Sequence, residues 1–373
     1  MRPRALSLAA FSLALAARHA LAGDPTERFW RLGPHPVGVR TLVIVDPSRE
    51  DPRCGGPRTL VTEVWYPAEE EARGGRPTRF AEFFGDRPDA AEGFVGYFRS
   101  RLEDVERRFR TIAVRGAKIR GGRCPLLVFS HGNGGVRHQN VFQMDHLASH
   151  GYVVASPDHT GNAGVTVLPD RVVPYDRSAR REFFAERPAD VRVVIDRLLE
   201  FSRDETHWLC GALDEGAIGV LGHSFGGYTA CRVAAEDPRV KAILPMTVAI
   251  FARADVPLMV MLGELDRTVG KAGNLLSRGT YGAAAPPKYL LVLRRGGHYS
   301  FSDMDCIRPD FGDGIGAETR DGRRVEYLDP ARTKAIVNAY SLAFFDAHLR
   351  SDPEAGAFLR RNHDPAEIEY HEK

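Results

Sequence analysis

Short runs of β-branched and other apolar residues alternate along the chain with longer segments whose apolar positions recur every three or four residues. The short runs predict buried strands, and the longer segments predict amphipathic helices. The predicted strands cover residues 37–45, 60–66, 125–130, 152–156, 217–221, 240–245, 256–262 and 289–293. The predicted helices cover residues 90–108, 138–150, 187–201, 225–236 and 329–350. This alternation is typical of an α/β fold with a mostly parallel central sheet and helices on both faces.

Two local features refine this fold prediction. The first two strands follow each other across a loop rich in Gly and Pro, so we expect them to form an antiparallel pair at one edge of the sheet. Gly151 stands directly after the helix predicted to end at His150, where glycine commonly terminates a helix. Trp65 and Tyr66 lie on the second strand, and strand core is their expected role, with an aromatic pair facing the substrate as the alternative.

The N-terminus has the pattern of a secretory signal. Arg2 and Arg4 precede an apolar run over residues 5–17, and Ala20-Leu21-Ala22 forms a small-x-small cleavage site before Gly23. A retained anchor is the alternative, although the apolar run is short for a membrane span. We therefore predict a signal peptide over residues 1–22 and an exported protein, either periplasmic or secreted.

No internal repeat or low-complexity linker divides the remaining chain. We expect residues 23–373 to form a single domain, in which residues 69–123 and 160–186 are insertions that form a pocket rim or lid. Within the first insertion, three aromatic residues share one helical face, which is either helix core or the apolar face of a lid. These residues are Phe94, Tyr97 and Phe98.

Composition excludes several classes of protein. The 373 residues are 43% hydrophobic and 27% charged with a formal net charge of +2, which excludes a disordered chain. The 51 basic residues are balanced by 49 acidic ones without a basic block, so we expect no nucleic-acid partner. No uncharged apolar stretch of about 20 residues follows the N-terminus, so we expect no membrane span in the exported chain.

The five cysteines are Cys54, Cys124, Cys210, Cys231 and Cys306. An odd number in an oxidising compartment allows at most two disulfides, and the spacing favours no particular pairing. None of them forms a Cys-x-x-Cys pair, so neither a zinc site nor a redox motif is predicted. Cys231 lies on the predicted helix over 225–236 and is expected to be a small core side chain.

The sharpest motif is Gly222-His223-Ser224-Phe225-Gly226-Gly227, between a predicted strand and a predicted helix. A Gly-x-Ser-x-Gly turn in this position holds the serine in a strained conformation at the carboxyl edge of a sheet. Its glycines are needed because a Cβ there would collide with the neighbouring strand or helix. We predict that Ser224 is a nucleophile, with an ordinary turn and a capping serine as the alternative.

A serine nucleophile needs a base and an acid that orients the base. Asp266 follows the strand over 256–262, and His298 follows the strand over 289–293 within a Gly-Gly-His sequence. We predict that His298 is the general base and Asp266 its partner, with Glu264 as a competing acid. The remaining histidines near site loops, expected to be structural hydrogen-bonding groups, are His131, His159 and His223.

A hydrolytic serine also needs backbone N–H groups that bind the developing oxyanion. The strand over 125–130 ends in His131-Gly132-Asn133-Gly134-Gly135, a loop that lets the backbone approach a substrate closely. We predict the N–H groups of Asn133 and Phe225 as the oxyanion hole, with a plain glycine turn as the alternative for the loop.

Four acids follow His298, and they lack the spacing of a calcium-binding loop, so we expect a solvated acidic loop. They are Asp303, Asp305, Asp310 and Asp313.

Together these segments resemble the α/β-hydrolases, and within them the group of platelet-activating-factor acetylhydrolases (plasma and intracellular isoform II) and predicted dienelactone hydrolases. The segments that carry the resemblance are Val64-Trp65-Tyr66-Pro67-Ala68, residues 125–135, residues 146–154, Pro157-Asp158-His159, Arg187-Pro188-Ala189-Asp190-Val191, the serine motif and residues 298–303. Dienelactone hydrolases proper have a cysteine nucleophile where Ser224 stands here, so lactone hydrolysis is poorly supported. The segments 69–123 and 160–186 match least well.

The resemblance implies an enzyme that hydrolyses carboxylic esters with short or truncated acyl groups, through an acyl-enzyme on Ser224 and without metal or cofactor. The implied substrate is a small-molecule or lipid ester, and the family's oxyanion donors match Asn133 and Phe225. Two alternatives are kept: a polyester or peptide hydrolase with the same triad, and an exported binding protein of the same fold without activity.

Overall fold

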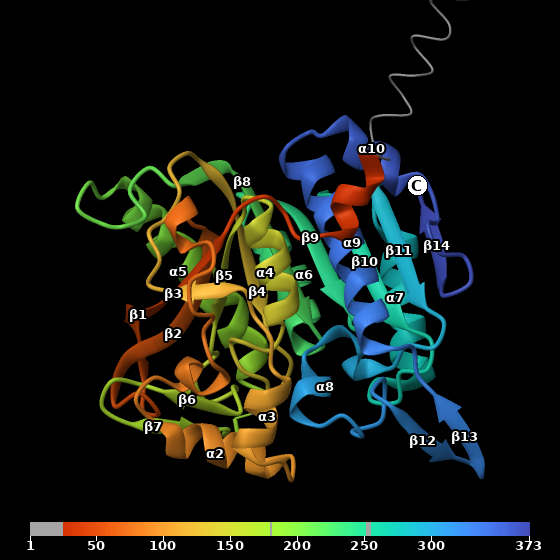
Figure 1. Cartoon of the computed structure of the whole chain (residues 1–373), viewed down its shortest axis with the longest axis horizontal. Coiled ribbons are helices and arrows are strands. Elements are labelled where there is room, and N and C mark those ends of the chain that lie inside the picture. The colour runs from red at the N-terminus through yellow and green to blue at the C-terminus, as the bar shows by residue number, and fades with distance from the viewer. Residues whose placement is uncertain (1–24, 180, 251–254) are drawn as a thin grey trace, which may run out of the picture.

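In the computed structural model, residues 25–179, 181–250 and 255–373 are described. Residues 1–22, predicted to be a signal peptide, lie outside the described residues. Ten strands form one sheet in the order β14-β11-β10-β9-β8-β4-β5-β2-β1-β3 (Figure 1). These strands are β1 (Val37–Asp51), β2 (Gly56–Pro67), β3 (Ala113–Arg115), β4 (Cys124–Ser130), β5 (Val153–Pro157), β8 (Leu213–His223), β9 (Val240–Met246), β10 (Leu258–Gly263), β11 (Lys288–Leu293) and β14 (Ile368–Glu372).

The centre of the sheet is parallel and its flanks are antiparallel. Strands β5, β4, β8, β9, β10 and β11 pair in parallel. The predicted antiparallel pair of β1 and β2 is confirmed, and β2 also joins β5 in antiparallel register. All eight predicted strands are present, and two further strands lie at the edges, β3 beside β1 and β14 beside β11.

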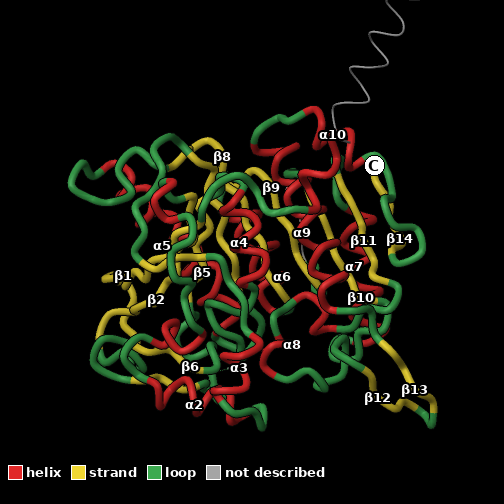
Figure 2. The backbone as a smooth tube through the Cα atoms, viewed as in Figure 1, coloured by secondary structure: helices red, strands yellow, loops and turns green. Residues whose placement is uncertain are grey.

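Helices cover both faces of the sheet, as the pattern predicts (Figures 1 and 2). The helices of the described chain are α2 (Pro88–Tyr97), α3 (Leu102–Arg108), α4 (Val141–Ser149), α5 (Phe183–Arg203), α6 (Phe225–Glu236), α7 (Gly270–Ala283), α8 (Met304–Ile307), α9 (Pro330–Leu349) and α10 (Pro353–Leu359). Short 3₁₀ helices are η1 (Pro25–Trp30), η2 (Glu70–Ala72), η3 (Phe80–Phe84) and η4 (His298–Phe301). No described helix is long and apolar enough to cross a membrane.

Two apolar cores lie on the two sides of the sheet. Along β4, the side chains of Leu127 and Phe129 pack with α4 and α9, whereas Leu126 and Val128 pack with α5 and α6 on the other face. Because successive side chains of a strand point to opposite faces, a strand covered on both sides must be apolar throughout. This burial explains why the predicted strands appear as continuous apolar runs.

Two predicted helices differ from the structure. The helix predicted over 90–108 is split into α2 and α3, and Arg99 between them has a left-handed φ of 59°. Helix α5 begins at Phe183 rather than at Arg187, so Pro188 lies inside it. Proline is tolerated best in the first turn of a helix, where the predicted start at Arg187 would have placed Pro188. Gly151 does end α4, with a φ of +90°.

The segments that leave the carboxyl ends of the parallel strands meet at one edge of the sheet, the lower edge in Figure 1. Two small hairpins lie there, β6 (Val165–Val167) with β7 (Val172–Pro174) and β12 (Ala317–Arg320) with β13 (Arg323–Glu326). Helices α2, α3 and α8 lie at the same edge. In sheets of this kind, ligands bind outside the carboxyl ends of the strands.

Candidate active site

Ser224 lies at the turn between β8 and α6. Its φ of 56° and ψ of −117° are a strained combination for a residue with a side chain. The strain is locked in because the Ser224 N–H donates to the Met246 carbonyl at 2.9 Å, and a Cβ on Gly222 or Gly226 would collide with neighbouring backbone. This is the geometry that the Gly-x-Ser-x-Gly motif predicts, and it leaves the side chain half-buried at the cavity.

His298 and Asp266 meet although 32 residues separate them. The Nδ1 atom of His298 lies 2.8 Å from Oδ2 of Asp266, and both residues are buried. Because an ionised carboxylate can only accept, Nδ1 carries the proton and Nε2 is left as the basic nitrogen. The competing acid Glu264 is exposed. His298 lines the same cavity as Ser224.

Asp313 holds the Asp266 and His298 loops together, and the prediction missed this role. Its carboxylate accepts hydrogen bonds from the backbone N–H groups of Arg267 at 2.8 Å, Thr268 at 2.9 Å and His298 at 3.2 Å. Asp313 is 3% exposed, so the prediction of a solvated acidic loop is wrong for it. The Thr268 hydroxyl also donates to this carboxylate at 2.7 Å. An acid whose partners all lie in distant segments leaves no motif in the sequence.

The solvated-loop prediction also fails for Asp303. This carboxylate is buried, accepts from the Phe142 N–H at 3.2 Å and pairs with Lys334, which binds Asp305 as well. Asp310 alone of the four acids has the predicted exposure, at 81% of its side chain. Among the described residues, no group of three or more His, Cys, Asp or Glu side chains could hold a metal ion.

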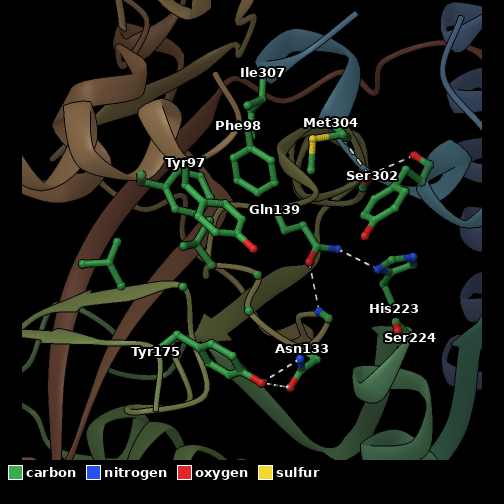
Figure 3. Close-up of a pocket in the computed structure, with 18 of the residues that line it drawn as sticks. Tyr97, Phe98, Asn133, Gln139, Tyr175, His223, Ser224, Ser302, Met304 and Ile307 are labelled. Carbon is green, nitrogen blue, oxygen red and sulfur yellow. Dashed lines mark hydrogen bonds between the residues drawn. The ribbon is translucent and has the colours of Figure 1, made fainter. Parts of the chain in front are cut away.

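A chain of hydrogen bonds joins the glycine loop to the His298 loop, and Figure 3 shows the bond between Gln139 and His223. The Gly132 N–H donates to Gln139 Oε1 at 2.9 Å, Gln139 Nε2 donates to His223 Nδ1 at 3.0 Å, and His223 Nε2 donates to the His298 carbonyl at 2.9 Å. Burial, together with the neighbouring His298, lowers the pKa of His223 to about 3. His223 therefore stays neutral, which is the protonation state that this chain of bonds requires.

The two predicted oxyanion donors lie at the cavity. Among the described residues, no acceptor is bonded to the N–H of Asn133 or of Phe225, and both residues line the cavity. The Asn133 side chain contacts Tyr175 at 2.9 Å and accepts from Asn162 Nδ2 at 2.9 Å. The loop around Asn133 is thus anchored while its N–H stays open to a ligand.

The cavity above Ser224 has a volume of about 1300 Å³. Both segments predicted as insertions line it, Phe94 and Phe98 from residues 69–123 and Tyr175 from residues 160–186. Tyr97 is 71% exposed, so it is not a helix-core residue. In Figure 3, Phe98, Met304 and Ile307 gather on one side of Gln139 and Ser224 lies on the other. The resulting wall is mostly aromatic and aliphatic.

A second serine, histidine and acid lie in line within the protein interior. Ser130 Oγ is 2.9 Å from His159 Nε2, and His159 Nδ1 is 2.9 Å from Asp190 Oδ2. All three residues are 0% exposed, and none of them lines the cavity. Burial lowers the pKa of His159 to about 3. The prediction that His159 is a structural hydrogen-bonding group agrees with these contacts.

All five cysteines are described, and each is a free thiol. Cys231 is fully buried on α6, as predicted.

Similarity to known proteins agrees with the fold. Residues 125–275 match the family model of the alpha/beta hydrolase fold, and residues 57–173 match that of platelet-activating factor acetylhydrolase, isoform II. The ferulic acid esterase from Streptomyces cinnamoneus has a TM-score of 0.71 and 27% sequence identity, over 91% of this chain and 97% of that one.

Platelet-activating factor acetylhydrolases of two mammals also match. The Canis lupus familiaris protein is 27% identical over 183 residues, 39% of this chain and 41% of the relative. The Cavia porcellus protein is 26% identical over 267 residues, 62% of this chain and 59% of the relative. The matched part therefore spans less than two thirds of these relatives. The chain has the α/β-hydrolase fold and, among proteins of that fold, resembles the platelet-activating factor acetylhydrolases.

Proposed function

We propose that this protein is a carboxylic ester hydrolase with Ser224 as nucleophile, His298 as general base and Asp266 as the acid that orients His298. The observation that carries the proposal is the strained Ser224, which lines the same cavity as His298, together with the buried His298–Asp266 pair 2.8 Å apart. A buried aspartate that fixes the tautomer and orientation of a histidine is the support that a serine hydrolase requires.

In the proposed reaction, Nε2 of His298 removes the Ser224 proton as Oγ attacks the ester carbonyl. The N–H groups of Asn133 and Phe225 bind the oxyanion of the tetrahedral intermediate. His298 then protonates the leaving alcohol, which leaves an acyl group on Ser224. Water repeats these steps and releases the carboxylic acid.

The test is the Ser224→Ala variant with p-nitrophenyl esters and a fluorophosphonate probe. We expect at least a 10³-fold loss of turnover and no labelling, with an unchanged melting temperature. Ser341→Ala removes a buried hydroxyl on α9 and is the control, which should stay labelled and active. Wild-type turnover by the Ser224 variant would overturn the mechanism. A wild-type protein that neither labels nor hydrolyses esters would instead be a binding protein.

Short or truncated acyl esters are the proposed substrates, by resemblance to the acetylhydrolases. The cavity favours a second ester class, because about 1300 Å³ exceeds the volume of most small-ligand sites and the wall holds Phe94, Tyr97 and Phe98. Esters of aromatic acids, such as the ferulic acid of the similar esterase, are therefore a second candidate. A series from acetate to decanoate, extended by ferulate, polyester and peptide substrates, ranks these classes by kcat/KM.

We also propose that the protein is exported after cleavage before Gly23. The supporting pattern is Arg2 and Arg4, the apolar run and the Ala-Leu-Ala site. The full chain expressed in a bacterium should yield a periplasmic or secreted product whose N-terminal residue is Gly23 by mass spectrometry. A cytoplasmic product that retains Met1 would contradict export.

A further inference from the structure

Arg187 on α5 is fully buried next to Phe225, one of the two predicted oxyanion donors. Its Nη2 donates to Ser130 Oγ at 2.8 Å and to the carbonyl of His131, the first residue of the glycine loop. Its guanidinium carbon lies 4.6 Å from the centre of the Phe225 ring. Arg187 thus contacts the loop that holds Asn133 and the residue that follows Ser224.

Asn162 extends this contact to Asn133 itself. Arg187 Nη1 donates to Asn162 Oδ1 at 2.7 Å, and Asn162 Nδ2 donates to Asn133 Oδ1 at 2.9 Å. The Asn162 carbonyl also accepts from the Gly134 N–H at 3.0 Å. Arg187 therefore orients Asn162, which supports the glycine loop through both Asn133 and Gly134.

Among the described residues, no carboxylate lies within ion-pair distance of Arg187, and its Nε–H has no acceptor. The nearby Asp190 is already bound by both Arg58 and His159. Burial lowers the pKa of Arg187 to about 9, with Asp190 opposing that change. At neutral pH the side chain is still a cation, held by neutral oxygens and an aromatic ring. A buried charge without a counter-ion is costly, and a nearby anion would offset that cost.

We propose that Arg187 is a positioning and electrostatic residue that stabilises the oxyanion formed between the N–H groups of Asn133 and Phe225. The proposal rests on the proposed function. The substrate ester is neutral at its carbonyl, and the negative charge develops only in the transition state. A fixed cation in a water-excluded site therefore lowers the barrier more than it strengthens ground-state binding.

The test compares Arg187→Met, Arg187→Gln and Arg187→Lys. We expect the Met and Gln variants to lose about 10- to 100-fold in kcat with KM within about threefold, and Lys to recover part of the loss because it keeps the charge. A trifluoromethyl ketone, which forms an anionic adduct with a serine, should bind more weakly by the same factor. The corresponding methyl ketone, which binds as a neutral molecule, should bind equally well to all variants.

Arg58→Met is the matched control for loss of a buried arginine. Arg58 is 1% exposed but is paired with Asp51 and Asp190. Its loss should lower the melting temperature without changing the affinity ratio of the two ketones. If the Arg187→Met variant does not fold, the comparison of Arg187→Gln with Arg187→Lys still tests the effect of the positive charge.

The outcomes separate this inference from the proposed function. An Arg187→Gln variant with the wild-type ketone ratio and wild-type kcat would overturn the role of Arg187 while the esterase stands. A wild-type protein that forms no adduct and hydrolyses no ester would overturn the proposed function, and the role of Arg187 with it.

Discussion

The carboxylate of Asp313 binds the backbone N–H of His298 at 3.2 Å, while the same carboxylate holds two N–H groups of the loop after Asp266. One buried side chain therefore sets the distance between the two loops whose side chains meet at 2.8 Å. Asp313 itself does not line the cavity.

Replacement of Asp313 by alanine should damage both stability and catalysis. Three backbone N–H groups would lose their acceptor, which costs about 2–4 kcal/mol of unfolding free energy, and the misplaced His298 should lower kcat at least about tenfold. Urea unfolding and ester kinetics measure the two effects. The exposed Asp310 on the same loop is the control, and Asp310→Ala should change stability by no more than about 0.5 kcal/mol. Equal effects of the two variants would contradict this role.

The acid of the proposed triad can be tested with variants of two neighbouring residues, Asp266 and Glu264. Asp266→Asn should lower kcat by about 10³- to 10⁴-fold, because an amide no longer fixes the His298 tautomer. Glu264→Gln changes an exposed side chain and should leave kcat within about twofold. Steady-state kinetics on a p-nitrophenyl ester distinguish them. The reverse order of effects would assign the acid to Glu264.

Asp145 on α4 should make stability fall as the pH rises. Burial raises the pKa of the Asp145 carboxyl to about 7. Hydrogen bonds from the Ile112 N–H and the Thr111 hydroxyl favour the anion and oppose this rise. Between pH 4 and pH 7 the folded protein therefore binds more protons than the unfolded chain, so this group's contribution declines across that window.

The variant that isolates this contribution is Asp145→Asn. The unfolding free energy of the wild type minus that of the variant should fall by up to about 4 kcal/mol from pH 4 to pH 7 and level off above it. Urea unfolding of both proteins at several pH values gives this difference. A difference that stays constant across the window would refute the raised pKa.

Replacement of His138 should also change the stability of the protein in a pH-dependent way. It is 2% exposed, stacked on Phe83 with Phe80 and Phe84 around it, and both ring nitrogens lack a partner within the described chain. Burial holds its pKa well below 6.5.

His138→Phe should therefore stabilise the protein by about 1 kcal/mol at pH 7. Its advantage should grow as the pH falls below 6.5, since the unfolded wild-type chain then gains a proton that the folded protein refuses. Thermal unfolding at pH 7 and pH 5 measures both effects. An advantage that shrinks on acidification would show that the folded imidazole is protonated.

The sheet was predictable from the sequence because burial on both faces makes the centre of a strand such as β4 apolar, as residues 125–129 show. The order of Ser224, Asp266 and His298 was predictable for a related reason, since each follows a buried strand whose carboxyl end reaches the same edge. Helix ends were less predictable. The left-handed Arg99 that separates α2 from α3 carries no sequence signal, and α5 begins at Phe183 rather than at the predicted Arg187.

Residues that support the site were not predictable in the same way. Asp313 and Arg187 act through backbone groups and neutral side chains that come from distant parts of the chain. Such partners are set by tertiary packing, and a pattern of residue types along one segment does not encode them.

A buried group in this molecule has the residue types of a catalytic triad but no access to a substrate. It consists of Ser130, His159 and Asp190. A template of a serine, a histidine and an acid would retrieve this group as well as the candidate site, although this group is sealed from any reactant. Ser130 lies within the regular strand β4, whereas Ser224 lies at a strained turn, and this difference distinguishes the two serines. Access and main-chain strain therefore deserve equal weight with side-chain spacing when hydrolases are sought among uncharacterised folds.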